Sequence, residues 1–275
     1  MTFVEAIVLG IVQGLTEFLP ISSTAHLRLI PTLFGWGDPG AARSAIIQLG
    51  TMLAVVAYFR RDIVNLFKAF IQGIFRGKPL EEFESRMAWY IALGTIPVGV
   101  LGLLFKDFIE TSARSLYLIS ASLVVLALIL AVAERISAFR RGVSSITLRD
   151  CVIVGFAQAL ALIPGSSRSG TTITAGLFLG LTREAAARFS FLLSIPAVVA
   201  SGLFELYEVR HSLSSAVAFD LSVATIVSAV TGYAAIAFLL KYLHSHTTYA
   251  FIWYRILLGG IILLLLLLKI ISPLS

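Results

Sequence analysis

The chain has 275 residues, of which 58% are hydrophobic and only 13% are charged, and its mean hydropathy is +0.95. A soluble domain carries about 25% charged and about 45–50% apolar residues, so the composition excludes a water-soluble enzyme and a disordered chain. The net charge of +6 does not indicate a nucleic-acid partner, because basic residues of membrane proteins mostly lie in loops and set the orientation of the chain.

The first apolar stretch covers residues 3–30. It is not expected to be a cleavable signal, because no basic segment precedes it and no small-residue cleavage site follows. Glu17, Pro20 and the run Ser22–Thr24 interrupt it. Broken backbone is tolerated at membrane depth only where protein or a watery cavity surrounds it. We therefore expect a re-entrant pair of helices that enters and leaves on the same side.

A helix needs about 20 apolar residues to cross the hydrocarbon core, and six longer runs qualify when small polar residues are tolerated. They cover about 44–59, 87–105, 116–133, 188–207, 217–240 and 250–271. Charged residues separate them. The expected fold class is an all-α polytopic membrane protein, with residues 1–275 forming a single integral membrane domain.

A second interrupted stretch, 150–181, lies between the third and fourth runs. It contains Pro164 and a loop rich in glycine and serine, and it is also expected to be a re-entrant helix pair. The single cysteine, Cys151, begins this stretch. One cysteine excludes an internal disulfide framework and a zinc site built from cysteines.

The two interrupted stretches resemble each other. Residues 8–15 align with 153–160, and after a one-residue gap residues 20–23 align with 164–167. The chain thus divides into repeats of approximately 1–133 and 150–275, each with one helix pair and three spans. An odd number of spans inverts the second repeat, and inverted repeats place their sites near the midplane at the repeat interface. We expect the two serine-rich loops to converge there.

The orientation is predicted from the basic loops. Most lysine and arginine residues fall in the loops around 60–86, 135–149 and 183–188. By the positive-inside rule these loops are cytoplasmic. Both termini and the mouth of the first helix pair then face outward.

The first loop carries a set of groups suited to acid–base chemistry. Gln13 and Glu17 are four residues apart and would share a helix face, and a carboxylate at membrane depth is a functional candidate by default. Glu17 is a candidate base or ligand of a divalent cation, and a serine or histidine is a candidate nucleophile. The nearby hydroxyl and imidazole groups belong to Ser22, Ser23, Thr24 and His26.

The second loop has the composition of an oxyanion cradle. Glycines permit close backbone approach, the start of the following helix would direct amides at an anion, and an arginine fork matches phosphate oxygens. A lysine that would complete a nucleotide-binding loop is missing. The residues are Gly165, Ser166, Ser167, Arg168, Ser169, Gly170, Thr171 and Thr172.

A purely structural interpretation exists for most of these groups. Loop hydroxyls can satisfy backbone groups freed near Pro20, and Glu17 can be a helix-end carboxylate satisfied by them. Arg168 fits this interpretation least, because a buried arginine among hydroxyls needs an anionic partner.

The segments 13–24 and 164–172 resemble the two signature motifs of the undecaprenyl-pyrophosphate phosphatase family, also called the bacitracin-resistance protein family. The resemblance extends over the whole chain in length, motif order and hydropathy. It implies a hydrolase of the bacterial inner membrane that converts undecaprenyl diphosphate to undecaprenyl phosphate and phosphate. This activity recycles the cell-wall lipid carrier and confers bacitracin resistance.

The resemblance also implies roles for individual residues. The family's (Glu/Gln)-x-x-x-Glu pair falls on Gln13 and Glu17, and this chain carries the glutamine variant at its first position, which leaves Glu17 as the main anionic group. The family's nucleophile falls on Ser23 with His26 as the rival, and its arginine falls on Arg168. Neighbouring hydroxyls fall on Ser167, Ser169 and Thr172. Mg²⁺ or Ca²⁺ is implied as a cofactor, with Glu17 as its ligand. The implied partners are the polyprenyl diphosphate and the bilayer, with a homodimer left open.

A transporter or flippase of polyprenyl phosphate is the alternative function. Inverted repeats with broken helices are typical of transporters, and an anion cradle can bind without hydrolysing. A carrier needs Arg168 and the amides, whereas an enzyme also needs Glu17 with Ser23 or His26. Phosphatidate-type phosphatases are disfavoured because position 174, where their motif requires histidine, is threonine.

Overall fold

The computed structural model describes residues 1–110, 115–210 and 214–273. These residues form an all-helical bundle in which six helices are long and apolar enough to cross a membrane. The only β pairing among the described residues is an isolated bridge between Arg141 and Leu181. The predicted all-α fold is therefore confirmed, and the described residues include the six predicted helices of membrane-spanning length and hydropathy.

The six long helices extend the predicted apolar runs by a few residues at most ends. The shortest has 19 residues, which is about 28 Å at 1.5 Å per residue and close to the hydrocarbon thickness of about 30 Å. Large apolar side chains such as Leu103, Val230 and Leu267 are exposed on their outer faces, as a lipid-facing surface requires. The helices are α3 (Gly40–Tyr58), α5 (Phe83–Leu104), α7 (Leu116–Ile136), α10 (Arg183–Val209), α11 (Ser215–Ser245) and α12 (Tyr249–Leu267).

Each interrupted stretch forms two short helices joined by a turn. The first stretch gives α1 (Phe3–Phe18) and α2 (Ser23–Phe34). The second gives α8 (Leu148–Ala159), a 3₁₀ turn η3 (Leu160–Leu162) and α9 (Arg168–Phe178). The longest of these four, α1 with 16 residues, spans only about 24 Å. None of them is long enough to cross the hydrocarbon core alone.

The same capping features begin the helices of both pairs. Thr2 and Thr147 cap α1 and α8, each in a reciprocal capping box with an acidic residue three positions later. Ser22 and Ser167 cap α2 and α9 with φ of 73° and 67°. A left-handed φ is rare for a residue with a side chain, so its occurrence at both caps is a specific likeness between the two turns.

These features follow one another at a constant spacing of 145 residues, from Thr2 to Thr147 and from Ser22 to Ser167. The left-handed glycines Gly35 and Gly180 keep the same spacing. The one-residue gap that the sequence alignment places before residue 20 is therefore wrong, because the capping residues keep the spacing without a gap. That alignment paired Pro20 with Pro164, whereas the backbone geometry pairs the capping serines.

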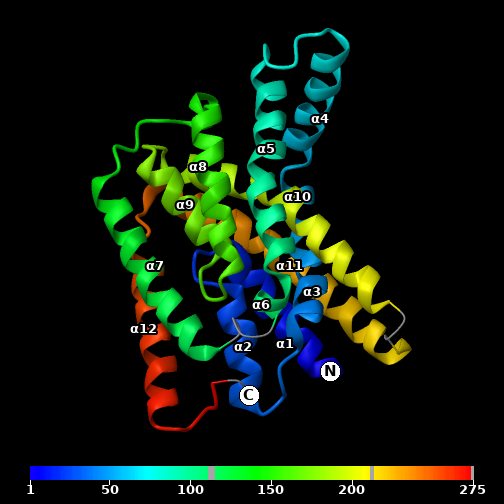
Figure 1. Ribbon diagram of the computed structural model, residues 1–275, viewed down its shortest axis with the longest axis vertical. Coiled ribbons are helices and arrows are strands. Elements are labelled where there is room, and N and C mark those ends of the chain that lie inside the picture. Colours follow the sequence, from blue (N-terminus) through cyan, green and yellow to red (C-terminus); the bar gives the residue numbers. More distant parts are fainter. Residues whose placement is uncertain (111–114, 211–213, 274–275) are drawn as a thin grey trace.

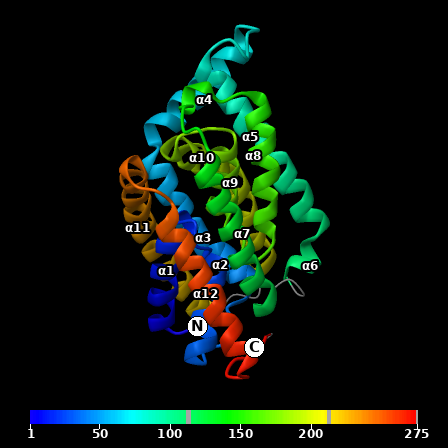
Figure 2. The same cartoon turned by 90° about the vertical axis from the view of Figure 1, so that its left-hand side faces the viewer.

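The two helix pairs pack against the long helices, with α1 against α11 and α8 against α5. Both views place the termini at the end of the molecule opposite the turn between α4 (Arg60–Phe75) and α5 (Figures 1 and 2). A last short helix, α6 (Lys106–Glu110), follows α5. The helix pairs expose large apolar side chains such as Leu15 and Phe156 on their outer faces, whereas the polar residues Glu17 and Ser166 near their turns are buried.

Close helix contacts depend on glycine. A side chain on Gly10 or Gly14 of α1 would collide with the backbone of α11. A Cβ at Gly155 of α8 would lie 2.6 Å from the carbonyl oxygen of Gly94 on α5. Small residues let membrane helices approach this closely, so these glycines set how near each helix pair lies to its neighbouring long helix.

We expect Gly155→Ala to lower the thermal stability of the protein. The added methyl group meets backbone, which cannot turn aside as a side chain could, and overpacking of this kind costs about 1–3 kcal/mol. The melting temperature in detergent is the measurement. Gly99→Ala on α5 is the control, because nothing lies within 4 Å of a Cβ there. Equal melting temperatures for the two variants would contradict this packing.

Candidate active site

Glu17 is the centre of a buried polar cluster in which both helix pairs take part. One carboxylate oxygen, Oε1, accepts hydrogen bonds from Arg168 Nη2 at 2.6 Å and Gln48 Nε2 at 2.7 Å. The other, Oε2, accepts from Ser23 Oγ at 2.7 Å and Gln13 Nε2 at 2.9 Å. The Glu17 side chain is only 3% exposed. Four donors, one of them cationic, thus offset the cost of burying this carboxylate.

The positions of these groups follow from the local structure. Gln13 and Glu17 lie one turn apart on α1, so the predicted shared face is confirmed by their hydrogen bond. Helix α1 ends at Phe18, directly after Glu17, and Ser23 is the first residue of α2. The turn between the helices therefore returns the Ser23 hydroxyl to the carboxylate six residues earlier.

The second loop meets the first at this point. Arg168 is the first residue of α9, and its ion pair with Glu17 joins residues 151 positions apart in the chain. The hydroxyl of Ser169 donates to the carbonyl of Leu19 at 3.1 Å. The structure thus brings the two serine-rich loops together, as the repeat predicts.

Arg168 retains donors that no protein group uses. Its side chain is 10% exposed, and Nε and Nη1 have no hydrogen-bond partner within the described parts of the chain. The hydroxyl of Ser166 is buried and also has no hydrogen-bond partner among the described residues. Buried donors are normally satisfied. Since the Glu17 pair uses Nη2, the N–H groups on Nε and Nη1, one on each side of Nη2, are available to an anion.

His26 is held apart from the carboxylate. Its Nδ1 lies 2.7 Å from the Ser22 carbonyl oxygen and its Nε2 lies 2.6 Å from the hydroxyl of Tyr254. A carbonyl only accepts, so Nδ1 carries the proton, and in the neutral ring Nε2 accepts from the tyrosine O–H. None of the described contacts of His26 reaches Glu17 or Ser23.

Most of the remaining predicted substrate-binding hydroxyls bond to the protein itself. Ser22 and Ser167 cap their helices through Ala25 N–H and Gly170 N–H. The threonines at 171 and 172 donate to the carbonyl of Arg168. Thr24 is half-buried beside Ser23. Their predicted contact with substrate stays a prediction, and their contribution visible here is to fix the two turns.

The two glycines of the second loop are required by close approach. Gly165 has φ of +89°, and a Cβ there would lie 2.6 Å from the Ile119 carbonyl oxygen. A Cβ on Gly170 would lie 2.6 Å from Nη1 of Arg255. Each glycine therefore permits a contact that any side chain would block.

Sequence reasoning missed Gln48, Tyr254 and Arg255. Gln48 is the amide within the span α3, and Arg255 is an arginine within the span α12. A polar or ionisable residue inside a span is itself a signal, although it does not say which loop the side chain meets. Tyr254 carried no signal, because tyrosine is common near span ends.

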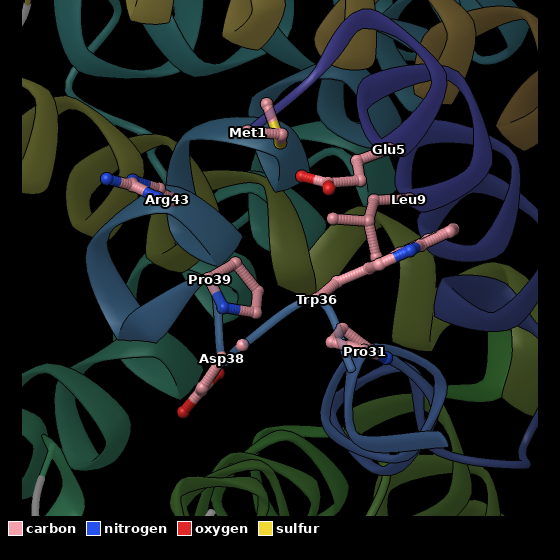
Figure 3. Close-up of a pocket in the computed structure, with 9 residues that line it drawn as sticks. Met1, Glu5, Leu9, Pro31, Trp36, Asp38, Pro39 and Arg43 are labelled. Carbon is pink, nitrogen blue, oxygen red and sulfur yellow. The ribbon is translucent and has the colours of Figure 1, made fainter. Parts of the chain in front are cut away.

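A small pocket opens near the N-terminus (Figure 3). It has a volume of ≈ 90 Å³ and includes none of the predicted site residues. In this view the side chain of Trp36 lies between Leu9 and Pro31. Its lining residues are Met1, Glu5, Leu9, Pro31, Trp36, Gly37, Asp38, Pro39 and Arg43. The predicted site residues therefore lie outside this pocket.

The donor set around Glu17 differs from the ligand set that a divalent cation needs. Mg²⁺ and Ca²⁺ take oxygen ligands, but the carboxylate here is surrounded by N–H and O–H donors. No cluster of three or more His, Cys, Asp or Glu side chains occurs in the described segments. The residues in this arrangement do not fit a cation on Glu17, since such a cation would have to displace Arg168 or the neighbouring donors.

The chain matches the family described as bacitracin resistance protein BacA over residues 6–261. A protein named undecaprenyl-diphosphatase from Chlorobium phaeovibrioides is 58% identical over 276 residues, which cover 97% of this chain and 98% of that protein. The protein of the same name from Myxococcus xanthus is 55% identical over 275 residues, covering 100% of this chain and 93% of its own. The match spans most of the chain and includes both serine-rich loops, so the chain belongs to the bacitracin resistance protein family.

Proposed function

We propose that this protein is an undecaprenyl-diphosphatase, a membrane hydrolase that converts undecaprenyl diphosphate to undecaprenyl phosphate and inorganic phosphate. The observation that carries the proposal is the contact chain from the Ser23 hydroxyl through the Glu17 carboxylate to the partly free Arg168 guanidinium. The printed names of the relatives support the substrate. Bacitracin resistance follows from the family and from this activity.

The proposed first step is an attack by Ser23 Oγ on the terminal phosphorus. The hydroxyl already donates to Glu17 Oε2 at 2.7 Å, so the carboxylate is placed to accept the proton as the Oγ–P bond forms. The bond from this phosphorus to the bridging oxygen breaks, and undecaprenyl phosphate leaves. Water then attacks the phosphoserine and the Oγ–P bond breaks. Glu17 returns its proton to Ser23 Oγ, and the inorganic phosphate departs with the proton that the water lost.

Arg168 stabilises charge in both steps. Nη2 remains on Glu17 while Nε and Nη1 face the phosphoryl oxygens, so one guanidinium aligns the base and binds the substrate. The first amides of α9 add to the positive potential, because the N-terminus of a helix favours anions. This arrangement supplies the positioning and electrostatic stabilisation on which phosphoryl transfer chiefly depends.

The same geometry favours Ser23 over His26 as the nucleophile. Ser23 contacts a carboxylate base, whereas both ring nitrogens of His26 are engaged by Ser22 and Tyr254. A carrier would need the arginine without this serine–carboxylate pair, so the transporter alternative is disfavoured. The expected Mg²⁺ or Ca²⁺ stays a prediction, and no step of the proposed reaction passes through it.

We further propose that the two helix pairs are re-entrant and that the chain is an inverted repeat in the bacterial inner membrane. The 145-residue spacing of the caps and the shortness of the four helices support this architecture. The basic end around the α4–α5 turn is then cytoplasmic, and the active site opens to the outer side. A homodimer and the lack of a nucleic-acid partner stay predictions.

Phosphate release from a purified polyprenyl diphosphate in detergent tests the function. The wild type is expected to release phosphate, whereas a carrier would release none. Glu17→Gln keeps the shape of the side chain but cannot accept the Ser23 proton, and loss of a general base lowers rates by about 10²- to 10⁴-fold. Glu84→Gln, which changes an exposed carboxylate, is the matched control and should retain the wild-type rate. An active Glu17→Gln protein would rule out this base.

A further inference from the structure

Two adjacent residues of α12 reach both halves of the candidate site. The hydroxyl of Tyr254 lies 2.6 Å from Nε2 of His26, and the two rings stack with centroids 5.6 Å apart and an interplanar angle of 10°. Nη2 of Arg255 donates to the carbonyl of Ser166 at 3.0 Å and, at 3.4 Å, to that of Gly165. One turn of a single helix thus contacts the first loop and the second.

Arg255 is unusual in its surroundings. The side chain is 0% exposed and bonds only to backbone carbonyls, which include those of Ser122 and Leu123 on α7. No carboxylate pairs with it among residues 1–110, 115–210 and 214–273, and its Nη1 has no hydrogen-bond partner there. A buried cation inside a membrane span is costly, so its placement against the loop carbonyls points to a function at that loop.

The contact from Arg255 sets the direction of the neighbouring amide. A planar trans peptide directs its N–H opposite to its carbonyl, so turning the Ser166 carbonyl toward Arg255 turns the Ser167 N–H away from it. Ser167 then adopts φ of 67° and caps α9, whose first residue is Arg168. The orientation of Arg168 toward Glu17 therefore depends on the turn that Arg255 holds.

Tyr254 acts on the corresponding turn of the first helix pair. The imidazole that it contacts also donates to the carbonyl of Ser22, the left-handed cap of α2. The tyrosine O–H occupies Nε2 and so favours the tautomer in which Nδ1 carries this proton. Ser23, the first residue of α2, follows directly.

We propose that Tyr254 and Arg255 are positioning residues that hold the two serine-capped turns in register. Tyr254 acts on Ser23 through His26, and Arg255 acts on Arg168 through the carbonyls of residues 165 and 166. The relevance to hydrolysis rests on the proposed function, whereas the positioning itself is measured without substrate. Neither residue needs to touch the diphosphate.

The Tyr254 part is tested with Tyr254→Phe, which removes the hydroxyl and keeps the stacking ring. Nitrogen-15 spectra of labelled histidine report the tautomer of His26, and His26→Asn identifies its signals among the four histidines. We expect the Nδ1–H tautomer to dominate in the wild type and to lose that dominance in Tyr254→Phe. Tyr249→Phe on the same helix is the control. An unchanged His26 spectrum in Tyr254→Phe would overturn this part.

The Arg255 part is tested with Arg255→Lys, which keeps the charge but loses the planar fork that bonds several carbonyls at once. Hydrogen–deuterium exchange over 164–171 is expected to rise at least several-fold, while Arg135→Lys at an exposed position of α7 leaves it unchanged. Gly170→Ala provides a second route, because its Cβ would lie 2.6 Å from Arg255 Nη1. If neither Arg255→Lys nor Gly170→Ala raises exchange, the positioning role is wrong.

Activity supplies the last measurement. A misplacement of about 1 Å at a reacting group lowers rates by up to about 10²-fold. Tyr254→Phe and Arg255→Lys should therefore each lower kcat by about 10- to 100-fold with KM nearly unchanged. Unchanged kcat in both would overturn the proposal. If the wild type releases no phosphate, the proposed function fails, and the spectra and exchange rates still decide the positioning role.

Discussion

Ser23→Ala is expected to abolish hydrolysis almost completely. The substitution removes the oxygen that would attack phosphorus, while Glu17 keeps its other three donors and the cluster keeps its charge balance. Loss of a covalent nucleophile lowers kcat by about 10⁴- to 10⁶-fold in well-studied enzymes. Phosphate release by the purified variant is the measurement, with the melting temperature as the check on folding.

The control for this variant is Ser222→Ala. Ser222 is exposed on α11 and its hydroxyl bonds only to the carbonyl of Ala218 in the same helix, so its loss should leave the rate unchanged. If the wild type is given a substrate with a radiolabelled terminal phosphate and quenched with acid, the trapped phosphoenzyme should carry the labelled phosphate on Ser23. Full activity of Ser23→Ala together with loss of activity in His26→Ala would instead assign the nucleophile to His26.

The second large effect is expected at Arg168. Arg168→Lys retains a positive charge but cannot bond Glu17 and two phosphoryl oxygens in one plane, so the rate should fall by about 10²- to 10³-fold. Arg168→Ala also leaves the buried carboxylate without its cation, and breaking a buried ion pair in this way costs about 3–5 kcal/mol. The alanine variant should therefore lose melting temperature as well as activity, whereas the lysine variant should lose mainly activity.

Arg188→Lys is the matched control for Arg168→Lys. Arg188 pairs with Asp62 at 3.3 Å, and both side chains are at least one-third exposed. Exposed pairs contribute about 0–1 kcal/mol, so neither stability nor hydrolysis should change measurably. Equal losses in the two lysine variants would mean that the effect at Arg168 is not specific to the active site.

The sequence predicted the large-scale architecture well because hydropathy depends on local composition. Six spans and two interrupted segments could be located without tertiary information, and the shared face of Gln13 and Glu17 follows from helical geometry alone. The convergence of Glu17 and Arg168 could be anticipated from the likeness between the two loops. Long-range likeness of this kind predicts which segments meet, although it does not predict the atoms that touch.

The residues that sequence reasoning missed come from other helices. Gln48 and Arg255 lie on spans that showed only an apolar background with an isolated polar residue. Their contacts with Glu17 and Ser166 depend on how α3 and α12 rotate about their axes in the bundle. That rotation is set by packing throughout the molecule, so the local pattern could not assign these residues to the site.

The ion pair between Glu17 and Arg168 has a mechanical consequence. Together with the hydrogen bond from Ser169 to the Leu19 carbonyl, it joins the two helix pairs, whose main contacts are with different long helices, α11 and α5. A shift of one pair relative to the other would separate these two side chains. The seating of each helix pair against its own long helix is therefore a condition for Glu17 and Arg168 to meet.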